Sequence, residues 1–241
     1  MARSPGSSLH YDIAEVLAEK GKMKMKILVF LGSIRTSTPP LPARVGERVA
    51  KACAAQCSRD GHNVVLIDPL DYDLGDVFKP HFSYAQGRAP LPLEKLASEI
   101  ASADGYVMVS PEYNHSMSPA LMHLLNHFGS SLFAFKPSAI VTYSAGQWGG
   151  VRAAVGMRAF LSELGCLPVS AMIHIPAAHT VFAADGSFAP EVDSMRWVSY
   201  IERTFSQLIW WAEAAGRERA RSGGTGPSPA FLRDPTQRNA P

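Results

Sequence analysis

The fold of this chain is decided by residues 105–125, which read GYVMVSPEYNHSMSPALMHLL. The apolar run at 105–109 predicts a buried strand, and the helical spacing of apolar residues from 120 onward predicts a helix. Between them lies a polar loop, residues 110–119, which carries an aromatic ring. A strand, a polar loop and a helix in this order are how an open α/β sheet forms a ligand crevice at the carboxyl ends of its strands.

The same layout occurs twice more along the chain. Residues 32–38 follow an apolar run at 26–31, and residues 144–150 follow another at 139–143. Further strands are expected at 63–67 and within 167–175, and helices at 43–58, 93–103, 120–128, 151–164 and 194–215. Strands that alternate with helices of this length predict an α/β fold, a doubly wound parallel sheet with helices on both faces. About five strands fit the flavodoxin-like order.

Three regions are expected along the chain. Residues 1–24 are interpreted as a loose N-terminal extension, residues 25–216 as one flavodoxin-like domain, and residues 217–241, which are rich in Gly, Pro, Ser and Arg, as a disordered tail. Two long connections, 69–92 and 176–193, interrupt the alternation of strands and helices. Connections of that length in compact domains are usually lids, interface arms or disordered segments.

The composition excludes several classes of protein. Residues 27–216 hold 13 Lys or Arg against 16 Asp or Glu, so this part is mildly acidic and poorly suited to nucleic acid. Three cysteines are too few for a disulfide framework and show no zinc-ligand spacing. No apolar run approaches the roughly 18 residues of a membrane span. The first 22 residues lack the apolar core of a secretory signal, so a reducing cytoplasmic setting is expected.

The first loop suits an anion. Gly32 allows a sharp turn, and the hydroxyls of Ser33, Ser37 and Thr38 stand with backbone N–H groups near a predicted helix N-terminus. Arg35 adds a forked cation that suits phosphate. The loop has neither the P-loop pattern nor G-x-G-x-x-G, so one terminal phosphate fits best. Leu41 completes the candidate cofactor-binding residues of this loop. The alternative is a capped helix start with a solvent-exposed arginine.

The second and third loops suit a flat ring system. Pro111, Glu112, Tyr113 and Asn114 offer an aromatic face, an amide and a carboxylate. Residues Ser144, Ala145, Gly146 and Gln147 begin a glycine-rich loop whose backbone can approach a ligand closely. An ordinary polar loop and a flexible turn are the respective alternatives. Together the three loops describe a site for a phosphorylated planar heterocycle, for which FMN is the natural candidate at this fold.

The three motifs, in this order, resemble the NADPH-dependent FMN reductases, a family that includes quinone, azo-dye and chromate reductases of flavodoxin-like fold. They are Gly32-Ser33-x-Arg35, Pro111-Glu112-Tyr113-Asn114 and Ser144-x-Gly146-x-x-Gly149-Gly150-x-Arg152. The resemblance covers roughly residues 25–175. It implies that the first loop holds the FMN phosphate and that 111–114 and 144–146 cradle the isoalloxazine. It also implies NADPH as reductant and a homodimer or homotetramer with FMN near an interface.

The chain departs from the family pattern at two places. Where the family usually reads Leu-Lys-Asn-x-x-Asp, this chain has Leu121-Met122-His123-Leu124-Leu125-Asn126, so two charges often found at the dimer contact are absent. The phosphate loop also carries Pro39, Pro40 and Pro42, apparently as an insertion.

The function predicted from the sequence is that of an NAD(P)H-dependent flavin oxidoreductase. FMN takes hydride from NADPH and passes two electrons to a small-molecule acceptor that is quinone-like, a flavin, an azo compound or a metal oxyanion. No catalytic side chain, metal, nucleic acid or membrane is required. The first alternative is an FMN-binding carrier or redox-sensing module without significant turnover. The second is a nucleotide-binding hydrolase that uses Ser144 or Glu112.

Overall fold

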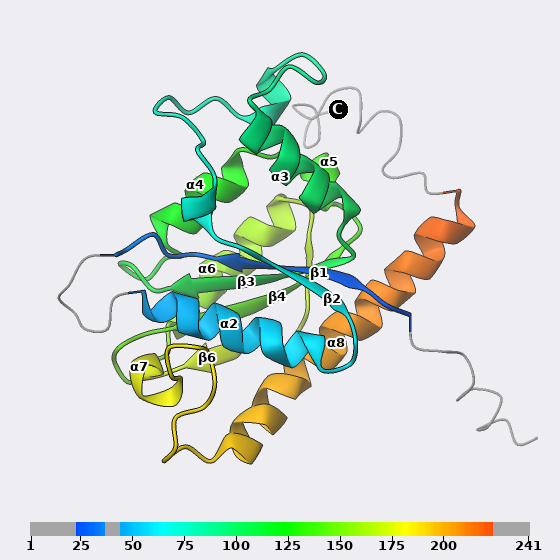
Figure 1. Ribbon diagram of the computed structural model, residues 1–241. Coiled ribbons are helices and arrows are strands. Elements are labelled where there is room, and N and C mark those ends of the chain that lie inside the picture. The colour runs from blue at the N-terminus through cyan, green and yellow to red at the C-terminus, as the bar shows by residue number, and fades with distance from the viewer. Residues whose placement is uncertain (1–22, 37–43, 224–241) are drawn as a thin grey trace, which may run out of the picture.

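A computed structural model describes residues 23–36 and 44–223 of the chain. Its centre is a parallel sheet in the order β2-β1-β3-β4-β5, with β6 also paired to β4 (Figure 1). The strands are β1 (Lys26–Leu31), β2 (Asn63–Ile67), β3 (Gly105–Pro111), β4 (Pro137–Tyr143), β5 (Leu167–Pro168) and β6 (Ile173–Ile175). This order confirms the predicted flavodoxin-like sheet. The fifth strand, expected within 167–175, consists of the two short pieces β5 and β6.

Helices cover both faces of the sheet (Figure 1). One face carries α2, α7 and α8, and the other carries α3, α4, α5 and α6. The bounds are α2 (Val45–Ser58), α3 (Leu91–Ser102), α4 (Pro119–Asn126), α5 (Ser130–Phe133), α6 (Val151–Glu163), α7 (Ala178–Val181) and α8 (Ser194–Arg221), with 3₁₀ turns η1 (Pro69–Asp71) and η2 (His81–Ser83).

The apolar runs of the central strands are explained by this double cover. Along β1, Ile27, Val29 and Leu31 enter the core under α2 and α8, whereas Leu28 and Phe30 enter the opposite core. Successive side chains of a strand point to opposite faces, so a strand covered on both faces must be apolar at every position.

Several predicted boundaries are corrected by the structure. Helix α2 begins at Val45 rather than 43, and α3 begins at Leu91 rather than 93, with a proline in its first turn. Helix α8 continues to Arg221, past the predicted start of the tail at 217. Ion pairs between Arg217 and Glu213 and between Arg221 and Glu218, each one helical turn apart, support this last stretch. Of the predicted extension 1–24, residues 1–22 lie outside the described residues, as does the predicted tail from residue 224 onward.

The long connection after β2 is attached to the face that carries α3 and α4. The backbone N–H of His81 donates to the carbonyl oxygen of His127 (2.7 Å), and its ring lies 3.2 Å from the carboxylate of Glu94. The Phe78 ring packs edge-on against the ring of His127. Residues 69–92 are therefore an arm folded against the domain. In the described part of the chain, every helix is too short or too polar to cross a membrane.

Candidate functional site

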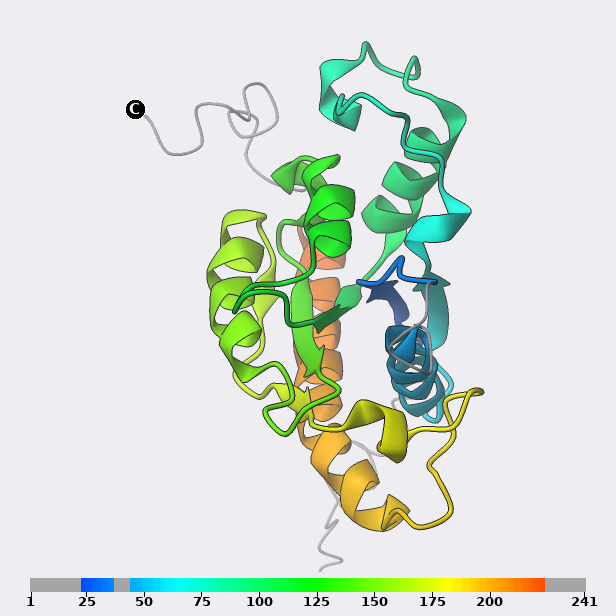
Figure 2. The same ribbon diagram turned by 90° about the vertical axis from the view of Figure 1, so that its left-hand side faces the viewer.

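The three loops leave the same edge of the sheet. Strands β1, β3 and β4 are parallel neighbours, with Leu31 opposite Val109 and Pro111 opposite Tyr143. Their carboxyl ends therefore lie side by side, and Figure 2 looks onto this edge. The strand order and register therefore bring three loops together, as predicted: residues 32–36, 110–118 and 144–150.

Gly32 fixes the exit of the first loop. Its backbone N–H donates to the carbonyl oxygen of Val109 (2.7 Å), and a Cβ at Gly32 would overlap that same oxygen. Only glycine allows this close contact between neighbouring chain segments. Ser33 is buried directly after it, whereas Arg35 is exposed. The other predicted phosphate-binding residues of this loop, Ser37, Thr38 and Leu41, lie outside the described residues.

Tyr143 packs between the first loop and the start of α2. Its ring is buried at the end of β4, and its hydroxyl faces Gly46 so closely that a Cβ at Gly46 would collide with it. Burial raises the pKa of the Tyr143 phenol well above its usual value, although a hydrogen bond from the Ser33 side chain acts in the opposite direction. Tyr143 thus stays protonated near neutral pH and packs the start of α2 against β4.

Arg44 is a candidate site residue that the sequence reasoning missed. It precedes α2, and its Nη2 donates to the Asp68 carboxylate (2.7 Å) and to the Ser33 carbonyl oxygen (3.2 Å). Its Nε is buried and has no hydrogen-bond partner within residues 23–36 and 44–223. A buried donor beside a helix N-terminus favours an anion. The sequence feature that could have identified Arg44 is its place as a second arginine between the first loop and the following helix.

The second loop is a tight hairpin turn. Tyr113 and Ser116 exchange two backbone hydrogen bonds of 2.9 Å each, and Asn114 and His115 both have positive φ (49° and 61°). Two consecutive residues of positive φ are typical of a type I′ turn. The turn leaves residue Tyr113 41% exposed, and Asn114 is also exposed, at the carboxyl edge of the sheet.

The second loop is continuous with the start of α4. The Ser118 hydroxyl accepts from the N–H of Leu121 (3.1 Å), and the backbone N–H of Ser118 donates to the Ser110 hydroxyl (2.9 Å). The predicted cap at Ser118, followed by Pro119 in the first turn of the helix, is confirmed.

Glu112 connects the second loop to the third. Its Oε2 accepts from the backbone N–H of Arg152 (3.3 Å) in the first turn of α6, and its Oε1 lies 3.9 Å from the Arg152 guanidinium. A carboxylate at this place complements the partial positive charge of a helix N-terminus. The carboxylate of Glu112 thus holds the second loop against the start of α6.

The third loop is closed by Ser144. The Ser144 hydroxyl donates to the carbonyl oxygen of Gly146 (2.7 Å) and accepts from the N–H of Gly149 (2.9 Å). Both bonds occupy the hydroxyl within the turn. This arrangement does not prepare Ser144 to act as a nucleophile, which also requires an adjacent base.

The glycines of the third loop have different roles. Gly149 and Gly150 have positive φ (59° and 76°), and a Cβ on either would press on residues Ile175 or Thr142. The protein itself therefore requires them. At Gly146 φ is not in the left-handed region, and a Cβ would meet no atom within 4 Å. The fold does not require glycine at 146, whereas a ligand lying against this backbone would.

A phosphorylated planar ligand such as FMN fits this set of groups. The phosphate end consists of Arg35, the N-terminus of α2 and Arg44, whose guanidinium is paired with Asp68 (2.7 Å) and lies 3.7 Å from Glu47. The flat end consists of the Tyr113 ring and the open backbone at Gly146, next to the exposed residues Ala145 and Gln147.

Comparison with known proteins points to one family. The sequence model of the NADPH-dependent FMN reductases matches residues 25–180. The chain is 30% identical over 109 residues to the NADPH azoreductase of Bacillus sp. (strain OY1-2), a match that covers 45% of this chain and 61% of that relative. It is also 30% identical over 147 residues to the quinone reductase of Escherichia coli K12, a match that covers 60% of this chain and 73% of that relative. The chain thus spans less than two thirds of the Bacillus relative's length.

Solved structures show the same fold. The flavoenzyme FerB, an NAD(P)H:(acceptor) oxidoreductase from Paracoccus denitrificans, aligns with a TM-score of 0.60 and 20% identity over 79% of this chain and 98% of that chain. The sheet order, the three loops and the family match over residues 25–180 agree with one another. The chain belongs to the NADPH-dependent FMN reductase family.

Proposed function

We propose that this protein is an NAD(P)H-dependent flavin oxidoreductase that holds FMN at the carboxyl edge of the sheet. The observation that carries the proposal is the convergence of three loops there, one of which has a glycine, Gly146, that the fold itself does not require. When bound, FMN supplies two-electron transfer from NADPH to an acceptor.

The phosphate end of the cofactor is assigned to the first loop and to α2. Ser33 and Arg35, with Ser37 and Thr38 as the sequence predicts, bind the phosphate. Arg44 joins them because Asp68 holds its guanidinium in place (2.7 Å) while its Nε keeps an unused hydrogen-bond donor. A guanidinium fixed by a carboxylate loses little side-chain entropy when it binds an anion.

The ring end is assigned to the backbone of residues 111–114 and 144–147. The Tyr113 ring offers a stacking surface, and Asn114 offers an amide to heteroatoms. Glu112 keeps the second loop against α6. Backbone N–H groups near the ring would stabilise negative charge that develops on reduction. With the Ser144 hydroxyl committed to the turn and Glu112 to α6, the hydrolase alternative has no evident nucleophile or base.

The acceptor class follows from an open, flat site. Tyr113 and Trp148 are both exposed, at 41% and 59%. A site of this kind admits quinone-like, azo and flavin acceptors, and the names of the azoreductase and quinone reductase relatives agree with such acceptors. Reduction of metal oxyanions, a preference for NADPH over NADH and a cytoplasmic location belong to the same proposal.

A homodimer is proposed to form over the exposed apolar side chains beside this site. They lie on the second and third loops, α4 and α6, and are Tyr113, Met122, Trp148, Val151 and Val155. Val155 is 72% exposed although it lies in the middle of a helix. Exposed apolar surface of this kind marks protein interfaces. Sedimentation velocity at micromolar concentration should show a dimer or larger assembly, and a monomer at every concentration would contradict the proposal.

The function is tested by an anaerobic titration of purified protein reconstituted with FMN. The protein should be yellow, should bleach on addition of NADPH and should regain its colour when a quinone or azo dye is added. Failure to bind FMN would refute the proposal. FMN binding with negligible NADPH oxidation in the presence of every acceptor would favour the carrier or redox-sensing alternative.

The role of Gly146 is tested by substitution with alanine. Gly146→Ala should weaken FMN binding at least tenfold, because the added methyl group occupies the space in which a ligand approaches the backbone. The free energy of unfolding without FMN should change by less than about 0.5 kcal/mol, as for exposed sites without contacts. The matched control is Gly156→Ala on α6, where a Cβ also meets nothing within 4 Å. It should leave FMN affinity unchanged.

The role of Asp68 is tested by comparing FMN with riboflavin, which lacks the phosphate. Asp68→Asn removes the charge that holds Arg44, so FMN affinity should fall about tenfold while riboflavin affinity stays the same. Asp71→Asn, an exposed neighbour on η1, serves as the control and should change neither. Equal losses for both flavins on Asp68→Asn would mean that Arg44 does not act at the phosphate.

A further inference from the structure

The third loop is bonded to a strand that carries none of the three loops. His174 lies in the middle of β6 and pairs with Thr142 of β4. Nδ1 of the His174 ring lies 2.8 Å from Oγ1 of Thr142, and this same Oγ1 lies 2.8 Å from the carbonyl oxygen of Gly149. The imidazole of β6 is thus connected to the loop through a single hydroxyl group.

The proton positions in this contact follow from the groups themselves. A carbonyl oxygen only accepts, so the one proton of the Thr142 hydroxyl goes to Gly149, and the hydroxyl then accepts from a proton on His174 Nδ1. Burial, with a smaller contribution from Arg203, lowers the pKa of His174, so its ring is neutral near pH 7 and carries its proton on Nδ1. The opposite tautomer would draw the hydroxyl proton to Nδ1 and leave the Gly149 carbonyl without this donor.

The hydrogen bonds continue through Gly149 to Gly146. The backbone N–H of Gly149 donates to the Ser144 hydroxyl (2.9 Å), and that hydroxyl donates to the carbonyl oxygen of Gly146 (2.7 Å). All four bonds therefore run in one direction, from His174 through Thr142, Gly149 and Ser144 to Gly146. Hydrogen bonds linked in this way strengthen one another. This hydrogen-bond network ends at the glycine whose backbone is open to a ligand.

The surroundings of His174 hold its ring in place. The backbone N–H of His174 donates to the Tyr200 hydroxyl of α8 (2.9 Å). Its neighbours on β6, Ile173 and Ile175, are completely buried in the core under α2 and α8. A donor fixed by packing and by a further hydrogen bond can orient a loop precisely.

We propose that His174 and Thr142 are positioning residues for the flavin ring, and that they hold the third loop in the form in which Gly146 meets that ring. The proposal rests on the proposed function, since it takes the ligand of this loop to be a flavin. The imidazole acts on the loop only through the Thr142 hydroxyl, and neither side chain has to contact the flavin. Because the hydrogen-bond network ends at the ring-binding loop, it supports binding of the ring rather than of the phosphate.

The test compares the dissociation constants of FMN and riboflavin, measured by titration of flavin fluorescence. Thr142→Val keeps the shape of the side chain and removes the hydroxyl, so it should weaken both flavins by the same factor, about fivefold. Thr142→Ser restores the hydroxyl and should bind both flavins within about twofold of the wild type.

His174 is tested in the same titration. His174→Ala should weaken both flavins about threefold, whereas His174→Asn, whose amide offers an N–H donor near the place of Nδ1, should bind them like the wild type. In the Thr142→Val background, His174→Ala should have no further effect, because the hydroxyl through which it acts is already absent.

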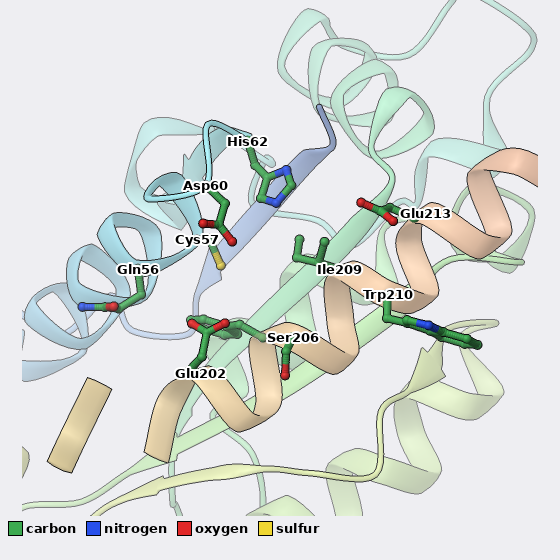
Figure 3. A pocket seen from close by; sticks show the side chains of 10 residues that line it. Gln56, Cys57, Asp60, His62, Glu202, Ser206, Ile209, Trp210 and Glu213 are labelled. Carbon is green, nitrogen blue, oxygen red and sulfur yellow. The ribbon is translucent and has the colours of Figure 1, made fainter. Parts of the chain in front are cut away.

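The control variants lie outside the hydrogen-bond network. His62 directly precedes β2 and lines a cavity between α2 and α8, at the amino edge of the sheet (Figure 3). His62→Asn keeps an acceptor for the backbone N–H of Met25. Thr204→Val removes a buried hydroxyl that has no hydrogen-bond partner within residues 23–36 and 44–223. Both variants should bind both flavins like the wild type.

The outcomes separate this proposal from the proposed function. A wild type that binds neither flavin would refute the proposed function and this role with it. A wild type that binds both, with Thr142→Val unchanged, with a larger loss for FMN than for riboflavin, or with additive losses in the double variant, would overturn only the positioning role. If Thr142→Val does not fold, the contrast between His174→Ala and His174→Asn decides the question, and equal affinities for these two would overturn the proposal.

Discussion

The candidate site depends on the parallel pairing of β1, β3 and β4 inside two covered faces. Because these strands run in one direction and pair in a fixed register, three loops far apart in the sequence leave the sheet at the same edge. The backbone of Gly32 contacts the carbonyl oxygen of Val109 directly, and this contact depends on the pairing of β1 with β3. It brings the first loop against the strand that carries the second, and a side chain at position 32 would separate them.

Several polar side chains of the loops form hydrogen bonds that hold the loops themselves in place. The Ser144 hydroxyl closes the third loop, the Ser118 hydroxyl caps α4, and the Glu112 carboxylate lies at the start of α6. These bonds fix the backbone while leaving its outer surface and the Tyr113 ring exposed. A rigid backbone edge suits a cofactor that carries the chemistry itself, because the protein then supplies position and electrostatics.

The sequence by itself determined the strands and the three loops, because strands covered on both faces must be apolar throughout and the segments at their ends must carry turn residues. The limits of β1 and β2 and the cap at Ser118 were predictable for the same local reasons. Only the tertiary structure decided that Glu112 lies at α6, that Arg44 is held by Asp68 and that Gly146, unlike Gly149 and Gly150, is not needed by the fold. These facts depend on distances between segments far apart in the chain, and local sequence patterns carry no information about such distances.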